Sequence, residues 1–220
     1  MNVSSEPNVT VSDIGTFSTW YNEKDQLHRE DGPAWIQHNN DGHIFEVWYK
    51  NDIYHRVGAP ASIIRRNGLV IGETWYEDGE LHRIGGPAVL RLNESGIVLE
   101  ELWVENGKLH RIGGPASYKR NERNADDVIV FEKWYEDGEL HRIGGPAVIQ
   151  KDYEGDVIGE DYFLYGNWIE KSDYIRRLSI VKRFANTLKN KYRTRLVSTL
   201  KKTDLCDESE LYNIIAEYAI

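Results

Sequence analysis

Histidine, arginine and tryptophan recur together along this chain, and such a combination could serve a metal site or a catalytic site. The sequence WYEDGELHRIGGPA occurs twice without a change, at Trp75–Ala88 and at Trp134–Ala147. Looser copies begin at Trp20, Trp48 and Trp103, and a degenerate sixth copy begins at Tyr162. In the first five copies the histidines stand in register, at His28, His55, His82, His110 and His141.

The spacing of these histidines argues against a ladder of metal ions. If each copy contributes two strands to a sheet, equivalent residues lie roughly 9–10 Å apart, because neighbouring strands are ~4.8 Å apart. Two nitrogen ligands of one zinc ion lie within about 4 Å of each other. Only a solenoid with one strand per turn in each sheet would bring them that close. We therefore predict no metal, and histidines that form hydrogen bonds near the Gly-Pro corner of each copy.

Catalysis is disfavoured because an active site needs different residues in different roles. Here histidine, arginine and tryptophan stand in the same relation in nearly every copy, which a packing requirement explains better than five identical sites. The chain also lacks a phosphate-binding glycine loop and the HExxH, CxxC and GxSxG patterns. We expect no enzymatic activity, no cofactor and no small-molecule substrate.

The copies have the pattern of β-hairpins. Each tryptophan is followed by a tight-turn sequence such as Asp78-Gly79 or Asn106-Gly107, which supplies the positive φ angles of short hairpins. A second turn varies in length between copies, at residues 39–42, 67–68, 93–96, 121–127 and 152–155, and β-branched residues flank it. This predicts a mainly β fold, an elongated antiparallel meander or solenoid of hairpin repeats, with a C-terminal α-helical appendage.

The predicted organisation has three parts. Residues 1–17 are expected to be a flexible N-terminus. Residues 18–170 are expected to form the β-repeat array, with five full repeats and one degenerate capping repeat. Residues 171–220 are expected to be a helical segment, first basic and then acidic. Such arrays bury their apolar faces by stacking neighbouring repeats, so the end units act as caps.

Glutamate and arginine are distributed unequally at the two ends of the array. A glutamate stands two residues before the aromatic residue in every copy but the first, and an arginine follows the histidine in every copy but the sixth. If each arginine pairs with the glutamate of the next repeat, a glutamate in the first copy and an arginine in the sixth copy would have no partner. These are the two residues that are absent. We therefore predict five ion pairs between repeats: Arg29–Glu46, Arg56–Glu73, Arg83–Glu101, Arg111–Glu132 and Arg142–Glu160. The alternative is that both are solvent-side residues of a duplicated unit.

The aromatic residue that opens each copy is a candidate for the core. Burying one tryptophan removes ~150–250 Å² from water, and a single-layer meander has few other ways to gain stability. We predict core positions for Trp20, Trp48, Trp75, Trp103, Trp134 and Tyr162.

With these residues in place, the copies resemble MORN-type repeats, hairpin units with a Tyr/Trp-x-x-Gly signature. They are most similar to the W-Y-x-x-G-x-L-H-R-x-x-G-P-A variety, as in arrays of large DNA viruses of amoebae and of some phages. The resemblance covers about residues 18–170, in units of 27–31 residues. It implies a non-enzymatic scaffold or adaptor.

Charge divides the chain in the same way as the repeats do. Residues 1–170 carry 16 Lys and Arg against 30 Asp and Glu, residues 171–202 carry 11 against one, and residues 203–220 carry five acids and no base. Apolar residues at spacings of three and four predict an amphipathic helix that begins near Ser172-Asp173, with a second short helix over 208–219. The candidate partner-binding residues on the basic face are Arg176, Arg177, Lys182, Arg183, Lys189, Lys191, Arg193 and Arg195.

These features favour a repeat scaffold that mediates protein–protein interaction or self-association, with a viral structural or virion-associated protein as one form. One alternative is an adaptor that binds nucleic acid or an anionic membrane through residues 171–202. Another is an antitoxin-like binding protein. The single cysteine, Cys206, together with the absence of a signal peptide and of a long apolar run, favours an intracellular site in a host cytoplasm or a virion. Neither the partner nor the docking mode of the basic helix follows from the sequence.

Overall fold

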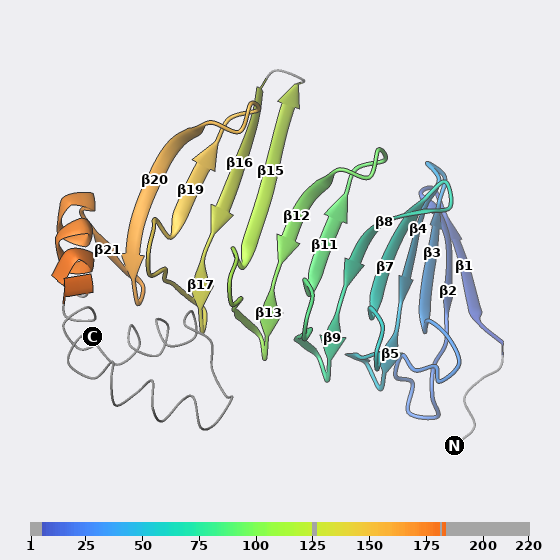
Figure 1. Ribbon diagram of the computed structural model, residues 1–220. Helices are drawn as coiled ribbons and strands as arrows, with labels where there is room; N and C mark the ends of the chain where they lie inside the picture. Colours follow the sequence, from blue (N-terminus) through green and yellow to red (C-terminus); the bar gives the residue numbers. More distant parts are fainter. Residues whose placement is uncertain (1–5, 125–126, 181, 184–220) are drawn as a thin grey trace, which may run out of the picture. The chain divides into compact units, whose positions relative to one another are not determined.

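The computed structural model describes residues 6–124, 127–180 and 182–183, and these residues form a mainly β structure (Figure 1). The chain divides into two compact units, Met1–Asn167 and Trp168–Ile220. Its main sheet has 13 antiparallel strands in the order β1-β2-β3-β4-β7-β8-β11-β12-β15-β16-β19-β20-β21, so strands that follow one another along the chain lie side by side. This confirms the predicted antiparallel meander of hairpins.

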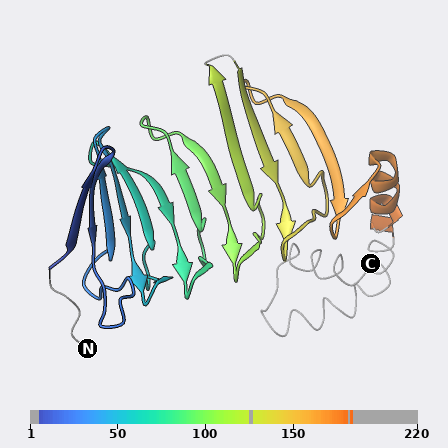
Figure 2. The same cartoon turned by 180° about the vertical axis from the view of Figure 1, so that it is seen from behind.

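Within the first unit the long strands lie side by side in a single layer, as the front and back views show (Figures 1 and 2). Their bounds are β1 Asn8–Ser12, β2 Gly15–Thr19, β3 Trp35–Asn39, β4 His43–Val47, β7 Ser62–Arg66, β8 Leu69–Thr74, β11 Val89–Leu92, β12 Val98–Leu102, β15 Ser117–Asn124, β16 Asp127–Lys133, β19 Val148–Lys151 and β20 Val157–Leu164. The last strand of the sheet is β21 Asn167–Ile169.

Four short hairpins branch from one margin of this sheet. They pair β5 Tyr49–Lys50 with β6 Ile53–Tyr54, β9 Tyr76–Glu77 with β10 Glu80–Leu81, β13 Val104–Glu105 with β14 Lys108–Leu109, and β17 Tyr135–Glu136 with β18 Glu139–Leu140. A full repeat from the second to the fifth copy therefore contributes two long strands to the sheet and one short hairpin to its margin.

The turns of the short hairpins have the geometry that their sequences predict. In the third copy both turn residues have positive φ angles, +48° at Asp78 and +86° at Gly79. Asp-Gly and Asn-Gly tolerate this conformation, and it suits the right-handed twist of two paired strands. The same geometry recurs at Asn106-Gly107 and Asp137-Gly138.

Small residues rather than large ones form the most deeply buried positions. The alanine that ends each full copy has no exposed surface: Ala34, Ala61, Ala88, Ala116 and Ala147. Its carbonyl accepts a hydrogen bond of 2.7–2.9 Å from the backbone N–H of the tryptophan that opens the same copy. The fourteen-residue motif is thus a closed loop whose two ends are bonded to each other.

The six predicted core aromatics are buried to different degrees along the array. Trp20 and Tyr162 are buried, each with 7% of its surface exposed. Trp48, Trp75, Trp103 and Trp134 are only half-buried. A single-layer sheet has no second layer to cover these rings, and an arginine side chain covers them instead.

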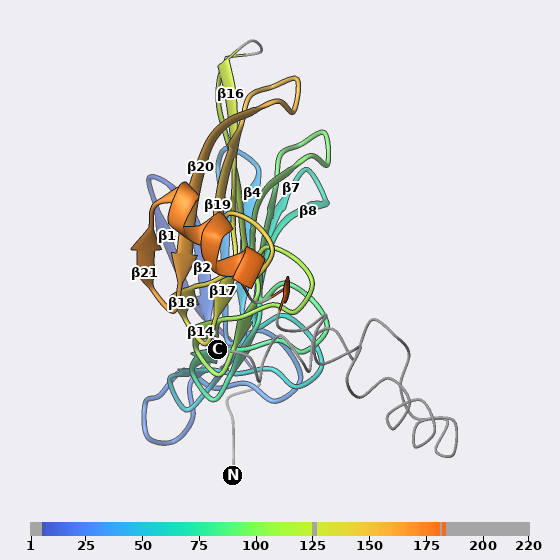
Figure 3. The same cartoon turned by 60° about the vertical axis from the view of Figure 1, so that its left-hand side comes forward.

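Two other expectations need correction in the first unit. Residues 8–17 are not a flexible N-terminus, because they form β1 and most of β2, where Val9, Thr10 and Val11 supply β-forming side chains. The insertion at 121–127 is not only a loop. It lengthens β15 and β16, with Asn121 opposite Ile129 and Glu122 opposite Val128, so this hairpin projects beyond its neighbours (Figure 3).

In the second unit the described residues 171–180 and 182–183 are helical, so a helix begins one residue before Ser172-Asp173, near the start that the sequence predicted. The residue that caps its first turn is Glu170, whose Oε2 accepts hydrogen bonds from the backbone N–H groups of Ser172 at 2.8 Å and Asp173 at 3.3 Å. The predicted helix over 208–219 lies outside the described residues. No helix in the described ranges is long and apolar enough to cross a membrane.

Candidate functional site

Each arginine of the repeated motif lies over the tryptophan of its own copy. The guanidinium carbon is 3.7–4.1 Å from the ring centroid in the pairs Arg29–Trp20, Arg56–Trp48, Arg83–Trp75, Arg111–Trp103 and Arg142–Trp134. In every copy Nη1 also donates a hydrogen bond of 3.0–3.4 Å to the carbonyl of the proline four residues later. The cation, the ring and the Gly-Pro corner thus form one stacked cluster.

In the first four copies this local stacking is found where an ion pair between repeats was predicted. Among the described residues no ion pair joins Arg29 to Glu46, Arg56 to Glu73, Arg83 to Glu101 or Arg111 to Glu132. Burial lowers the pKa of Arg56, and the carboxylate that opposes this shift is Glu46 of its own copy. The fifth predicted pair, Arg142–Glu160, stays a prediction; in that copy too the arginine lies over its tryptophan, Trp134.

The glutamates bond to residues on their own face of the sheet. Glu46 pairs with Arg65 at 2.9 Å, and Glu132 pairs with Lys151 at 2.8 Å. Both cations stand two residues beyond the residue directly opposite the glutamate, Ile63 and Ile149. A diagonal neighbour of this kind is within reach of a long side chain.

Sequence reasoning missed Arg65 and Lys151, although the diagonal rule would have found them once the register was known. The other predicted glutamates also have neighbours within their own copy or sheet. Glu101 accepts a hydrogen bond from Trp103 Nε1 at 3.4 Å, and Glu160 accepts one from the Tyr162 hydroxyl at 3.2 Å. Glu73 lies on β8 between Ile63 and Leu90.

The histidines, not the arginines, make the side-chain bond that repeats from each copy to the next. The Nδ1 atom accepts a hydrogen bond of 3.1–3.3 Å from a backbone N–H in the following tight turn, in the pairs His28–Asn51, His55–Asp78, His82–Asn106, His110–Asp137 and His141–Tyr165. A backbone N–H of the same turn donates to the carbonyl of the residue before each histidine, at 2.9–3.0 Å.

These contacts correct the expected role of the histidines and define their chemistry. Instead of bonding near the Gly-Pro corner, each imidazole uses its Nδ1 lone pair to fix the hairpin of the next repeat. At His55 and His110 a carboxylate oxygen of the bonded aspartate also lies 3.0 and 3.5 Å from Nδ1. In the bonds to the backbone the Nδ1 atom is the acceptor.

A row of exposed aliphatic side chains runs along the same margin of the first unit. The residue after the motif arginine is Val57, Ile84, Ile112 or Ile143, and its surface is 82%, 79%, 91% and 41% exposed, respectively. We call these four residues the aliphatic row. In the first copy Glu30 takes this place, and its side chain is 82% exposed. The sequence signal, an isoleucine directly between Arg and Gly-Gly, was available but was not singled out.

Acidic side chains accompany the aliphatic row. The side chains of Glu77, Asp78 and Asp137 in the tight turns are 63%, 84% and 83% exposed. Each short hairpin and each row residue lie between the end of one long strand and the start of the next, so both stand at the same margin of the sheet. The margin therefore presents apolar side chains beside negative charge.

A hollow of about 520 Å³ lies at this margin, and residues of the first and second copies line it. Its lining includes Arg29, Trp48, Lys50 and Arg56. Arg29 is bonded to Asp31 at 2.8 Å, and this contact lowers the pKa of Asp31. The two arginines of the lining are already stacked on tryptophans, Arg29 on Trp20 and Arg56 on Trp48.

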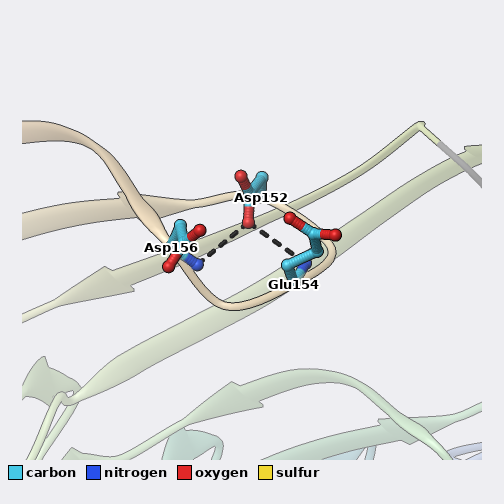
Figure 4. Close-up of side chains that lie close together, drawn as sticks. All are labelled: Asp152, Glu154 and Asp156. Carbon is cyan, nitrogen blue, oxygen red and sulfur yellow. Dashed lines mark hydrogen bonds between the residues drawn. The ribbon is translucent and has the colours of Figure 1, made fainter.

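Three acidic side chains lie close together in the turn between β19 and β20 (Figure 4). The Asp152 carboxylate accepts hydrogen bonds from the backbone N–H groups of Glu154 at 3.1 Å and Asp156 at 2.9 Å. This is the ordinary way in which an aspartate closes a turn. It accounts for the position of Asp152 without any ion.

Half of the predicted basic partner-binding residues fall within the described part of the second unit. Arg176, Arg177, Lys182 and Arg183 are exposed, and Arg176 bonds to Asp173 at 2.9 Å. The other four, Lys189, Lys191, Arg193 and Arg195, lie outside the described residues.

Comparisons of the chain with protein families, with characterised proteins and with solved structures found no match.

Proposed function

We propose that the chain is a non-enzymatic repeat scaffold that binds a protein partner along the aliphatic row. The carrying observation is that Val57, Ile84 and Ile112 keep about four fifths or more of their surface exposed in an otherwise well-bonded motif. Exposed apolar side chains that recur in a line favour a protein interface. The resemblance to MORN-type arrays supports the same function and suggests a virion or an infected cell as its setting.

The partner that suits this margin combines aliphatic and basic side chains. Each repeat contributes two strands to the sheet, so row residues stand roughly 9–10 Å apart. The turn acids Glu77, Asp78 and Asp137 lie beside them and favour Lys or Arg on the partner. The histidines and arginines of the motif already hold the fold together, which leaves the row and the acids for recognition.

The experiment compares proteins retained by the intact chain with those retained by two variants. In the row variant Ile84 and Ile112 become Ser. In the control variant Leu69 and Ile97, which are 58% and 43% exposed at the variable turns of the opposite margin, become Ser. We expect a partner that the intact chain and the control retain and the row variant loses. Equal retention by both variants would refute the proposal.

A second candidate function rests on the exposed bases of the described helix. Arg176, Arg177 and Lys182 would contact nucleic acid or an anionic membrane. Replacing all three by Glu in the full chain separates the candidates. If this change removes binding to duplex DNA or to phosphatidylserine vesicles while the row variant binds normally, the adaptor function replaces the scaffold function.

A further inference from the structure

The strand β1 is an open edge of the main sheet. Among the described residues it pairs with β2 alone, through five pairs from Asn8↔Thr19 to Ser12↔Gly15. All five of its residues are exposed, including Val9 at 60% and Val11 at 76%. Sheet edges usually carry a lysine, a proline or a bulge that prevents pairing with another chain. The sequence Asn-Val-Thr-Val-Ser contains none of these.

The sequence of β1 is nearly the same when it is read in either direction. If two copies of the strand pair in antiparallel fashion about Thr10, Val9 of each copy stands opposite Val11 of the other. Thr10 meets Thr10 on the opposite face, and Asn8 meets Ser12. Pairs of β-branched side chains and pairs of threonines both stabilise neighbouring strands. The strand is thus complementary to itself in one register.

Charge favours this edge over the other surfaces for a contact between two copies. Residues 1–170 carry a net charge of −14, so most surfaces of the first unit repel a second copy. The strands β1 and β2 contain no charged residue. In the register about Thr10, Glu6 would stand opposite Ile14, and Asp13 opposite Pro7. No like charges face each other, and Pro7, which has no N–H donor, limits the pairing to the strand itself.

We propose that β1 is a dimerisation edge, through which two copies of the chain join their main sheets in antiparallel pairing centred on Thr10. The contact is two-fold symmetric, so it closes with two copies and does not grow into a fibre. With only five residues on each side it lies at the small end of stable interfaces, and we expect a dissociation constant in the micromolar range or weaker. This inference does not depend on the proposed partner.

The experiment measures the mass of the full chain in solution over a range of concentrations, by sedimentation equilibrium. We expect a rise from monomer to dimer in the natural chain. Thr10→Lys places two like charges opposite each other on the axis and should leave a monomer. Ser95→Lys makes the same change of charge in an exposed turn and should still dimerise. Thermal unfolding of the Thr10→Lys variant shows whether the monomer is folded.

A cross-link tests the register independently. With Cys206 changed to Ser, we expect Thr10→Cys to form a disulfide between two copies on mild oxidation, because directly opposed residues on paired strands place their Cβ atoms close enough. Ser95→Cys in the same background should not. A natural chain that stays monomeric at every concentration would overturn the proposal. So would a dimer that persists in Thr10→Lys, or a dimer that Ser95→Lys also abolishes.

Discussion

The Nδ1 atom of His82 accepts a hydrogen bond of 3.1 Å from the backbone N–H of Asn106, which belongs to the next repeat. The same bond recurs at the other four histidines of the motif. It explains why histidine, which could have indicated a metal or a catalytic base, is repeated in register. Each imidazole forms a hydrogen bond that fixes the tight turn of the next repeat.

Replacing His82 by Ala should weaken the contact between the third and fourth copies. We expect the free energy of unfolding to fall by about 1 kcal/mol, the usual net contribution of a hydrogen bond. Urea unfolding followed by tryptophan fluorescence measures this change. The control is His38→Ala, because His38 is exposed on β3. An equal loss of stability in both variants would contradict the role of Nδ1.

The stacking of Arg83 on Trp75 should appear as an energetic coupling between them. In a double-mutant cycle with Arg83→Met and Trp75→Leu, we expect a coupling energy of about 0.5–1 kcal/mol. The corresponding cycle of Arg83→Met with Glu101→Leu should give additive losses, since these two residues form no ion pair in the structure. A larger coupling energy with Glu101 than with Trp75 would contradict the stacking and support an ion pair between Arg83 and Glu101.

The two glycines of the Gly-Gly-Pro corner should respond differently to substitution by alanine. Gly85 has a φ of +75°, so Gly85→Ala is expected to cost about 1 kcal/mol from backbone strain alone. At Gly86 the three atoms nearest a new Cβ belong to the guanidinium group of Arg83, with Cζ at 2.8 Å, and a small shift of that side chain would make room. The second copy has Ala59 at this position. We therefore expect Gly86→Ala to cost less than Gly85→Ala in thermal unfolding.

The N-terminus of the C-terminal helix should depend on pH through Glu170. Hydrogen bonds from Ser172 lower the pKa of this carboxyl. A carboxyl with a lowered pKa in the folded state stabilises the helix above the pKa of the unfolded chain, about 4.3, and this contribution is lost as the pH falls through the folded value. We expect the Ser172 amide resonance to titrate below pH 4.3. It should show no such step in Glu170→Gln.

The sequence predicted the features that depend on neighbours along the chain. Asp78-Gly79 was recognised as a tight turn because the φ angles it needs are a local property. The pairing of Arg83 was not predicted correctly, because an arginine can reach a tryptophan, a carbonyl or a carboxylate, and the choice depends on the folded geometry. The distribution of glutamate and arginine at the two ends of the array suggested Glu101, but in the structure the guanidinium lies over the ring of Trp75.

The N-terminal strand was missed for a different reason. Val9 and Val11 alternate with polar residues as a strand requires, yet they lie outside any copy of the repeated motif. The strand signal is therefore local and separate from the repeated motif. Similarly, Glu46 was assigned a partner by its place in the repeat, whereas Arg65 is its neighbour across the sheet.

The alanine that closes each copy has no exposed surface, and the chain has no large side chain that is fully buried among its described residues. Each repeat is therefore stabilised by contacts with the repeats before and after it. The copies do not share one hydrophobic core to which all of them must contribute. Such a chain can gain or lose a whole copy by gene duplication or deletion and remain folded. The two unchanged copies of WYEDGELHRIGGPA, the third and the fifth, keep the same local structure although a different copy lies between them.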